Sequence, residues 1–234
     1  MSKAVALFIV ATSLPAPLLA QVGHDPARSP YQPIRSRTSL LVMGGYLAGS
    51  SGILGIGPAD AFLGGLRYEM RLTGPTDASL AVSYGNFERL VPDPRAPADS
   101  QITGPVNQSV VFVDAGLQIL LTGDKTWKGL APYLGATLGM GFGSGVPQDT
   151  SGYRFRAKFT TGPMLGLRVY PASGLTLRLE GRMVFWQLKY PTTFFLSPER
   201  APTDAPLLDQ LNDSDSEWTA HPTLSLGLGW SFRL

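Results

Sequence analysis

Cysteine is absent from the 234-residue sequence, and charged residues make up only 15% of it, against about 25% in an average soluble domain. A chain that is exported without disulfides must obtain its stability from a sizeable core, from ligands or from a membrane. The net charge is +2, and a balance so close to neutral argues against nucleic acid as a partner. Sparse charge and abundant glycine together indicate a β-rich protein in contact with lipid.

Long hydrophobic runs are also missing beyond the N-terminus, so no transmembrane helix is expected there. Residues 1–20 combine a basic start at Lys3, an apolar run from Ala4 to Ala11 and a small-residue ending at Ala20. This layout predicts a secretory signal peptide; the alternative, a buried N-terminal helix, lacks an amphipathic pattern. We expect a flexible periplasmic leader over residues 21–38 and a single domain over residues 39–234.

The end of the chain alternates with a period of two. From Leu224 to Leu234 every even position is large and apolar, and every odd position is Ser, Gly or Arg. This pattern fits a strand with one apolar face. Seven earlier segments alternate in the same way, which gives eight expected strands: 39–47, 61–72, 78–87, 109–121, 130–142, 152–170, 175–188 and 221–232.

The links between these segments alternate between short and long. Residues 73–77, 122–129 and 171–174 form short turns, whereas residues 48–60, 88–108, 143–151 and 189–220 form longer links. This order predicts an eight-stranded antiparallel up-and-down transmembrane β-barrel with short periplasmic turns and longer extracellular loops. The last strand should pair with the first and close the barrel. The proline-rich second link is expected to be disordered, and the last link to be a mobile, solvated acidic hairpin.

Alternation alone does not say which face meets lipid, since a soluble barrel would bury the apolar face instead. Ten glycines share the charged face, where they make room for long side chains inside a narrow barrel. Aromatic residues lie towards the ends of the apolar face, as expected at membrane interfaces: Tyr46, Phe62, Tyr84, Phe142, Tyr153, Phe185, Trp230 and Phe232. We therefore expect the apolar face to contact lipid and the charged face to line the lumen.

With its signal peptide, its eight strands, the phrase from Ala131 to Gly139 and its terminal strand, the chain resembles the small outer-membrane β-barrel family of Gram-negative bacteria, the OmpA-barrel, OmpX and OmpW-like group. The resemblance implies a monomer in the cell outer membrane, in contact with membrane lipid and lipopolysaccharide. It also implies that Trp230, Phe232 and Leu234 form an insertion signal for the barrel-assembly machinery. The family ends in an aromatic residue, and Leu234 departs from that pattern.

The expected lumen carries an excess of positive charge. Its predicted charge network comprises Arg67, Glu69, Arg71, Asp114, Arg154, Arg156, Lys158, Arg168, Arg178, Glu180 and Arg182, with Arg233 as a further cation. Because desolvated charges must be paired or hydrated, we interpret this set as a structural ion-pair network. The alternative is a narrow anion-preferring pore, because rings of Arg and Lys select anions.

Catalytic chemistry has little support in the sequence. Some outer-membrane barrels modify lipid A with a histidine, a serine and an acid. Here only His221 lies near such residues, namely Ser214, Asp215, Ser216 and Glu217, which precede it. The acidic last link fits no standard Ca²⁺ loop. We expect no catalytic site, cofactor or metal, and a structural or surface-interaction role; a lipid A-modifying enzyme is the second alternative.

Overall fold

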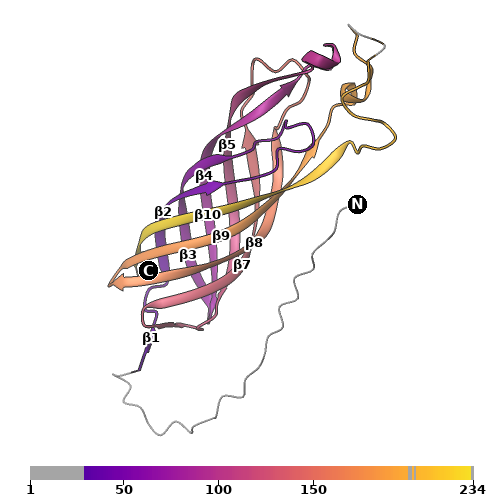
Figure 1. The fold of residues 1–234 in the computed structure, drawn as a ribbon. Coiled ribbons are helices and arrows are strands. Elements are labelled where there is room, and N and C mark those ends of the chain that lie inside the picture. The colour runs from indigo at the N-terminus through magenta and orange to yellow at the C-terminus, as the bar shows by residue number, and fades with distance from the viewer. Residues whose placement is uncertain (1–28, 200–201, 203, 233–234) are drawn as a thin grey trace.

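The computed structural model describes residues 29–199, 202 and 204–232, so the predicted signal peptide and the first part of the predicted leader lie outside the described residues. Eight long strands form one antiparallel barrel (Figure 1). They are β2 (Thr38–Leu47), β3 (Ala61–Thr73), β4 (Thr76–Pro92), β5 (Ile102–Leu120), β7 (Leu130–Gly143), β8 (Ala157–Ala172), β9 (Leu175–Lys189) and β10 (Ser216–Phe232). No helix within the described ranges is long and apolar enough to cross a membrane.

The barrel closes between its first and last long strands. β10 pairs with β2 in continuous antiparallel register from Thr223↔Leu47 to Phe232↔Thr38. Every other long strand pairs with both of its neighbours, and β7–β8 completes the ring. The predicted eight-stranded antiparallel barrel and its closing seam are confirmed.

The period of two decides which side chains face outward. On β10, Leu224, Leu226 and Leu228 are 62%, 65% and 54% exposed, whereas Gly227 and Ser231 face the interior and are buried. The other long strands follow the same rule and present Leu, Val, Ile and Met to the outside. An exposed apolar surface of this extent matches the lipid-facing band expected of a membrane-spanning barrel.

The long connections are more ordered than expected. β4 and β5 continue beyond the barrel as a paired hairpin up to Pro92↔Ile102, so the prediction of a disordered second link is wrong. A 3₁₀ turn, η2 (Ala98–Ser100), lies at its tip, and a second one, η3 (Thr192–Phe195), lies in the last link. Three long links pack together over the barrel end through Leu54, Ile56, Tyr153, Tyr190, Phe194 and Leu208. The last link is therefore anchored through Tyr190, Phe194 and Leu208 and is not a free hairpin.

The expected flexible leader is also partly structured. β1 (Tyr31–Pro33) pairs with β6 (Lys125–Trp127), a short strand in the turn between β5 and β7. Just after β1, Ile34 donates its amide to the Asp124 carbonyl at 3.0 Å and packs beneath the barrel against a cluster that includes Tyr133. This segment lies at the end of the barrel that carries the short turns (Figure 1).

The sixth strand begins later than predicted, at Ala157 instead of residue 152. Arg156 has a φ of 52°, in the left-handed region, and this breaks the alternation. Before the break, Tyr153 and Phe155 are buried, while Arg154 and Arg156 are exposed. The expected positions of these four residues are therefore reversed: the two aromatic residues face inward, and the two arginines lie outside the lumen.

Glycine makes room for large side chains inside the barrel. A Cβ at Gly166 would collide with the ring and hydroxyl of Tyr133, and a Cβ at Gly139 would collide with the Asp114 carboxylate. The expected exchange between small residues on some strands and long ones on others is thus seen directly at these positions.

A methyl group at Gly166 should destabilise the barrel, because Tyr133 is boxed in by its neighbours. We expect Gly166→Ala to lower the free energy of unfolding by about 1–3 kcal/mol, the usual range for overpacking. Gly181→Ala is the matched control, because nothing lies within 4 Å of a Cβ at Gly181. Urea unfolding of the folded barrel in lipid vesicles checks this, and equal stability of the two variants would contradict it.

Candidate functional site

The Arg178 guanidinium on β9 is the centre of the charged interior. It forms ion pairs with Glu69 from β3 and with Glu180 two residues along its own strand. It also donates to the Gln118 Oε1 at 3.0 Å and stacks over the Tyr133 ring, 4.3 Å from the ring centroid. The Arg178 side chain is fully buried, so its charge depends on the neighbouring Glu69 and Glu180 carboxylates.

Glu180 receives hydrogen bonds from two further residues, Arg67 and Tyr133. Arg67 binds it in a bidentate arrangement, with both nitrogen–oxygen distances at 2.8 Å. The Tyr133 hydroxyl donates to it at 3.0 Å from β7, which is separated from β9 by β8 alone. A carboxylate so fully coordinated has no free oxygen for a substrate or an ion.

Asp77 joins the network near the short turns, although the sequence reasoning placed it in a turn. It accepts from Arg168 at 2.5 Å and from Arg71 at 2.8 Å, and Arg168 reaches Glu69 at 3.1 Å. Asp77 has the same inward parity as Ser79 on β4. Extending the alternation of that strand by one residue would have identified it.

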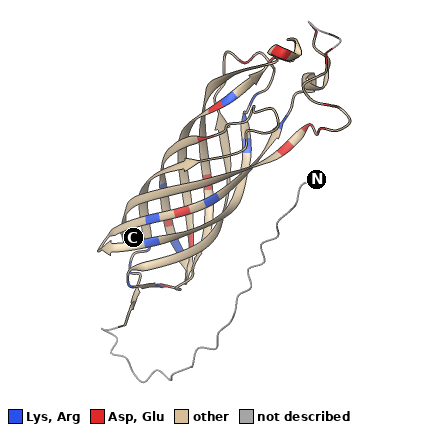
Figure 2. Ribbon diagram, in the orientation of Figure 1, with Lys and Arg blue, Asp and Glu red and all other residues tan. Residues whose placement is uncertain are grey.

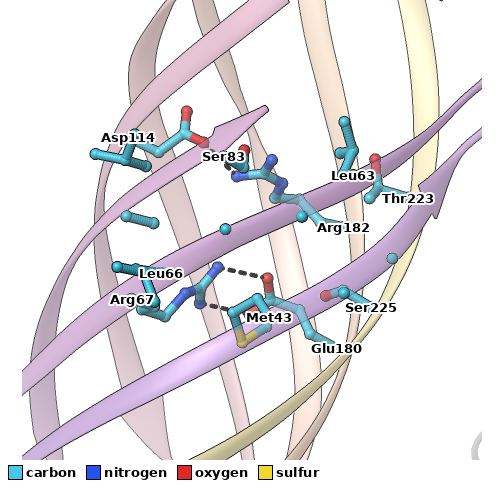
Figure 3. Close-up of a pocket in the computed structure, with 16 residues that line it drawn as sticks. Met43, Leu63, Leu66, Arg67, Ser83, Asp114, Glu180, Arg182, Thr223 and Ser225 are labelled. Carbon is cyan, nitrogen blue, oxygen red and sulfur yellow. Dashed lines mark hydrogen bonds and ion pairs between the residues drawn. The ribbon is translucent and has the colours of Figure 1, made fainter. Parts of the chain in front are cut away.

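Arg182 and Asp114 form a separate pair higher in the barrel. Their nitrogen–oxygen distance is 2.8 Å, and Thr160 donates to the same carboxylate at 3.3 Å. Figure 3 shows this pair beside the Arg67–Glu180 pair, at a small cavity between them. The cavity measures about 40 Å³, which is room for a water molecule but not for an organic ligand.

The interior charges nearly balance once their positions are known. In the charged half of the lumen, five arginines and four carboxylates form the ion pairs: Arg67, Arg71, Arg168, Arg178 and Arg182 with Glu69, Asp77, Asp114 and Glu180. Arg154 and Arg156 are exposed outside this set, Lys158 is half-buried at the rim, and Arg233 lies outside the described residues. Figure 2 shows charged segments within the barrel and others towards its long-loop end.

The half of the lumen nearest the long loops is apolar, which the expectation of a polar lumen did not include. Phe112 stacks on Trp186 with ring centroids 5.8 Å apart, and Phe155 meets the same indole edge-on at 5.9 Å. Leucine, valine and phenylalanine side chains complete this layer: Leu47, Leu63, Phe87, Val110, Val184 and Leu188. These residues lie at inward-facing positions near the loop-side ends of their strands. The alternation of the sequence could therefore have predicted that they face the lumen.

His221 belongs to this apolar layer rather than to a catalytic set. Its ring stacks on Trp186 with a centroid distance of 3.4 Å, and its Nε2 shares a hydrogen bond of 2.8 Å with the Thr219 hydroxyl. Glu217 instead accepts from the Tyr190 hydroxyl at 2.6 Å and from the Ile53 amide at 3.1 Å. The structure does not bring the proposed histidine, serine and acid together.

Two tyrosines tie the long links to the barrel rim. Burial raises the pKa of Tyr190, and its hydrogen bond to the Glu217 carboxylate raises it further. Burial also raises the pKa of Tyr153, whose ring lies against Arg89, 5.2 Å from the guanidinium carbon. Arg89 in turn pairs with Asp149 at 2.6 Å. Both phenols stay protonated at neutral pH, so these contacts persist there.

Of the expected insertion signal, Trp230 is 60% exposed on the outer face and Phe232 is half-buried. Leu234 lies outside the described residues. Among residues 29–199, 202 and 204–232, no group of three or more His, Asp or Glu side chains is placed to hold a metal ion.

Comparisons with known proteins support the barrel fold. No protein-family model matches the sequence, and no curated protein has significant sequence similarity to it. Among solved structures, the chain is similar to Neisserial surface protein A, with a TM-score of 0.50, 15% identity, and coverage of 83% of this chain and 97% of that one. This similarity supports the fold and no particular activity.

Two further structures match more loosely. The N-terminal β-barrel domain of Pseudomonas aeruginosa OprF has a TM-score of 0.43 and 15% identity, covering 85% of this chain and 100% of that one. The Yersinia pestis attachment invasion locus protein Ail, solved with the heparin analogue sucrose octasulfate, has a TM-score of 0.36 and 14% identity, covering 84% and 97%.

Removing the central cation should be costly, because Glu69 and Glu180 would each lose a buried partner. We expect Arg178→Met to lower the free energy of unfolding by about 3–5 kcal/mol, the range for breaking a buried ion pair from one side. Arg154→Met is the control, because Arg154 is exposed, and we expect it to change stability by less than about 0.5 kcal/mol. Guanidinium unfolding followed by tryptophan fluorescence distinguishes them; an Arg178→Met barrel as stable as the parent would refute the central role.

Proposed function

We propose that the protein is an integral, monomeric outer-membrane β-barrel with a structural or surface-interaction role and no catalytic activity. The observation that carries this proposal is the combination of an apolar exterior with an interior that is filled by its own side chains. A barrel of this kind has nothing inside to offer a substrate. Its exposed rim and long loops are then the surfaces available to partners.

The filled interior disfavours the alternative of an anion-preferring pore. An ion would have to pass both the charged layer around Arg178 and the aromatic layer around Trp186, and both side chains are fully buried. The positive excess that motivated the pore is reduced to five cations against four anions inside. Paired arginines provide no free positive ring for an anion.

The alternative of a lipid A-modifying enzyme has equally little support. His221 is buried against Trp186 and hydrogen-bonds Thr219, so it is not positioned to activate a serine. Outer-membrane lipid and lipopolysaccharide remain the expected surroundings, and the barrel-assembly machinery remains the expected insertion partner. The exposed Trp230 near the chain end supports a role in such insertion.

Membrane insertion is tested by fractionation and by gel mobility. We expect the protein in the outer-membrane fraction, with a folded band that migrates differently from the boiled one, because a closed antiparallel barrel resists detergent. Recovery as a soluble periplasmic monomer would overturn the proposal.

The closed lumen is tested by electrical recording. We expect the purified barrel to give no steady conductance in planar lipid bilayers, because both interior layers are packed. A reproducible anion-selective conductance that changes in Arg178→Ala would support the pore instead. A barrel fraction known to be folded from its gel mobility serves as the sample in both cases.

A further inference from the structure

The ladder between β8 and β9 stops short of the long-loop rim. Their last pair towards this rim is Thr161↔Phe185, although β8 begins at Ala157 and β9 continues to Lys189. The two strands therefore separate at their loop-side ends. A groove of about 600 Å³ occupies the split, with residues 152–159 on one side and Gln187, residues 189–191 and Trp218 on the other.

Four cations line this groove. They are Arg154, Arg156, Lys158 and Lys189, and no acidic residue is among the lining side chains. The described part of the chain places no carboxylate in an ion pair with any of the four. Lys158 is half-buried and close enough to Lys189 for their charges to repel. Such unbalanced charge favours an anionic ligand.

The groove also has an apolar side that is continuous with the lipid-facing surface. Phe159 and Trp218 belong to its lining and are 51% and 57% exposed on the outward faces of β8 and β10. Further from the rim, the outer surfaces of β8 and β10 carry exposed leucines, including Leu165 and Leu224. A ligand seated in the split would thus meet cations at the rim and hydrocarbon-compatible surface beneath.

The cationic rim and the apolar side of the groove together indicate which kind of ligand would fit it. A phosphorylated lipid presents an anionic headgroup above acyl chains, and this matches cations above exposed aromatic residues. A free phosphate ion would use only the upper half of the groove. The two exposed arginines suit phosphate especially well, because a guanidinium binds its oxygens in a bidentate manner.

We propose that the split between β8 and β9 is a binding site for the phosphorylated headgroup of a lipid in the surrounding leaflet. The inference rests on the proposed membrane function and deepens it by naming a partner and its site. Arg154 and Arg156, which do not join the interior network, receive a role here. Lys158 and Lys189 complete the site, and the lipid phosphate offsets their mutual repulsion.

The test uses the full-length folded barrel in detergent with bisphosphorylated lipid A as the probe, and native mass spectrometry measures retained lipid. We expect the double variant Arg154→Gln/Arg156→Gln to bind about thirtyfold more weakly, since each cation near the surface contributes about a factor of five. Fully dephosphorylated lipid A should bind the parent protein with a similar loss. Millimolar inorganic phosphate should displace little of the bound lipid A.

The matched control is Lys125→Gln/Lys128→Gln, which removes two exposed cations at the turn end of the barrel. It should bind lipid A as the parent does. Unchanged binding by the arginine variant, equal binding of dephosphorylated lipid, or full displacement by inorganic phosphate would overturn the inference. Heat-shifted gel mobility is read in every sample, so a barrel that folds in the membrane but does not select the phosphorylated lipid refutes this site and leaves the proposed function standing.

Discussion

The charge of Arg178, held between Glu69 and Glu180, is the interaction on which the interior of this barrel depends. A guanidinium without solvent exposure must be neutralised by nearby carboxylates. Those carboxylates then require further cations, which Arg67 and Arg168 supply from β3 and β8. One buried charge therefore links strands on different sides of the lumen. The luminal glycines follow from the same constraint, because these long side chains need empty space on the facing strands.

The interior is filled in two chemically different layers. Ion pairs occupy the part nearer the short turns, and an aromatic cluster around Trp186 occupies the part nearer the long loops. The loops add a third, apolar cover through residues such as Tyr190 and Phe194. Because side chains fill each layer, the surface available to a ligand lies at the outside of the rim. There β8 and β9 separate, and no carboxylate of the described residues pairs with the four cations.

Much of the barrel could be predicted from the sequence, because a period of two specifies both strand and face. The closing pair of β10 with β2 follows from that pattern, as do the inward positions of Arg178 and Glu180. The prediction placed Arg154 and Arg156 in the lumen, which is wrong. The left-handed backbone at Arg156 exchanges the inward and outward positions before it, and the amino-acid pattern does not reveal such a residue. Asp77 was missed, because a carboxylate beside Gly and Pro has the composition of a turn. The continuation of β4 and β5 beyond the barrel depends on pairing between segments that are separated in the sequence. The prolines in these segments instead favoured the prediction of a disordered link.

The central claim, an interior filled by its own side chains, is tested most directly by chemical access to a luminal position. The chain has no cysteine, so Thr137→Cys, at a site 3% exposed, introduces a unique thiol. Gly145→Cys, in an exposed loop with nothing within 4 Å, is the reference. A water-soluble maleimide should label the loop thiol rapidly and the luminal thiol only after unfolding. Equal labelling of the two positions in the folded barrel would contradict a filled interior.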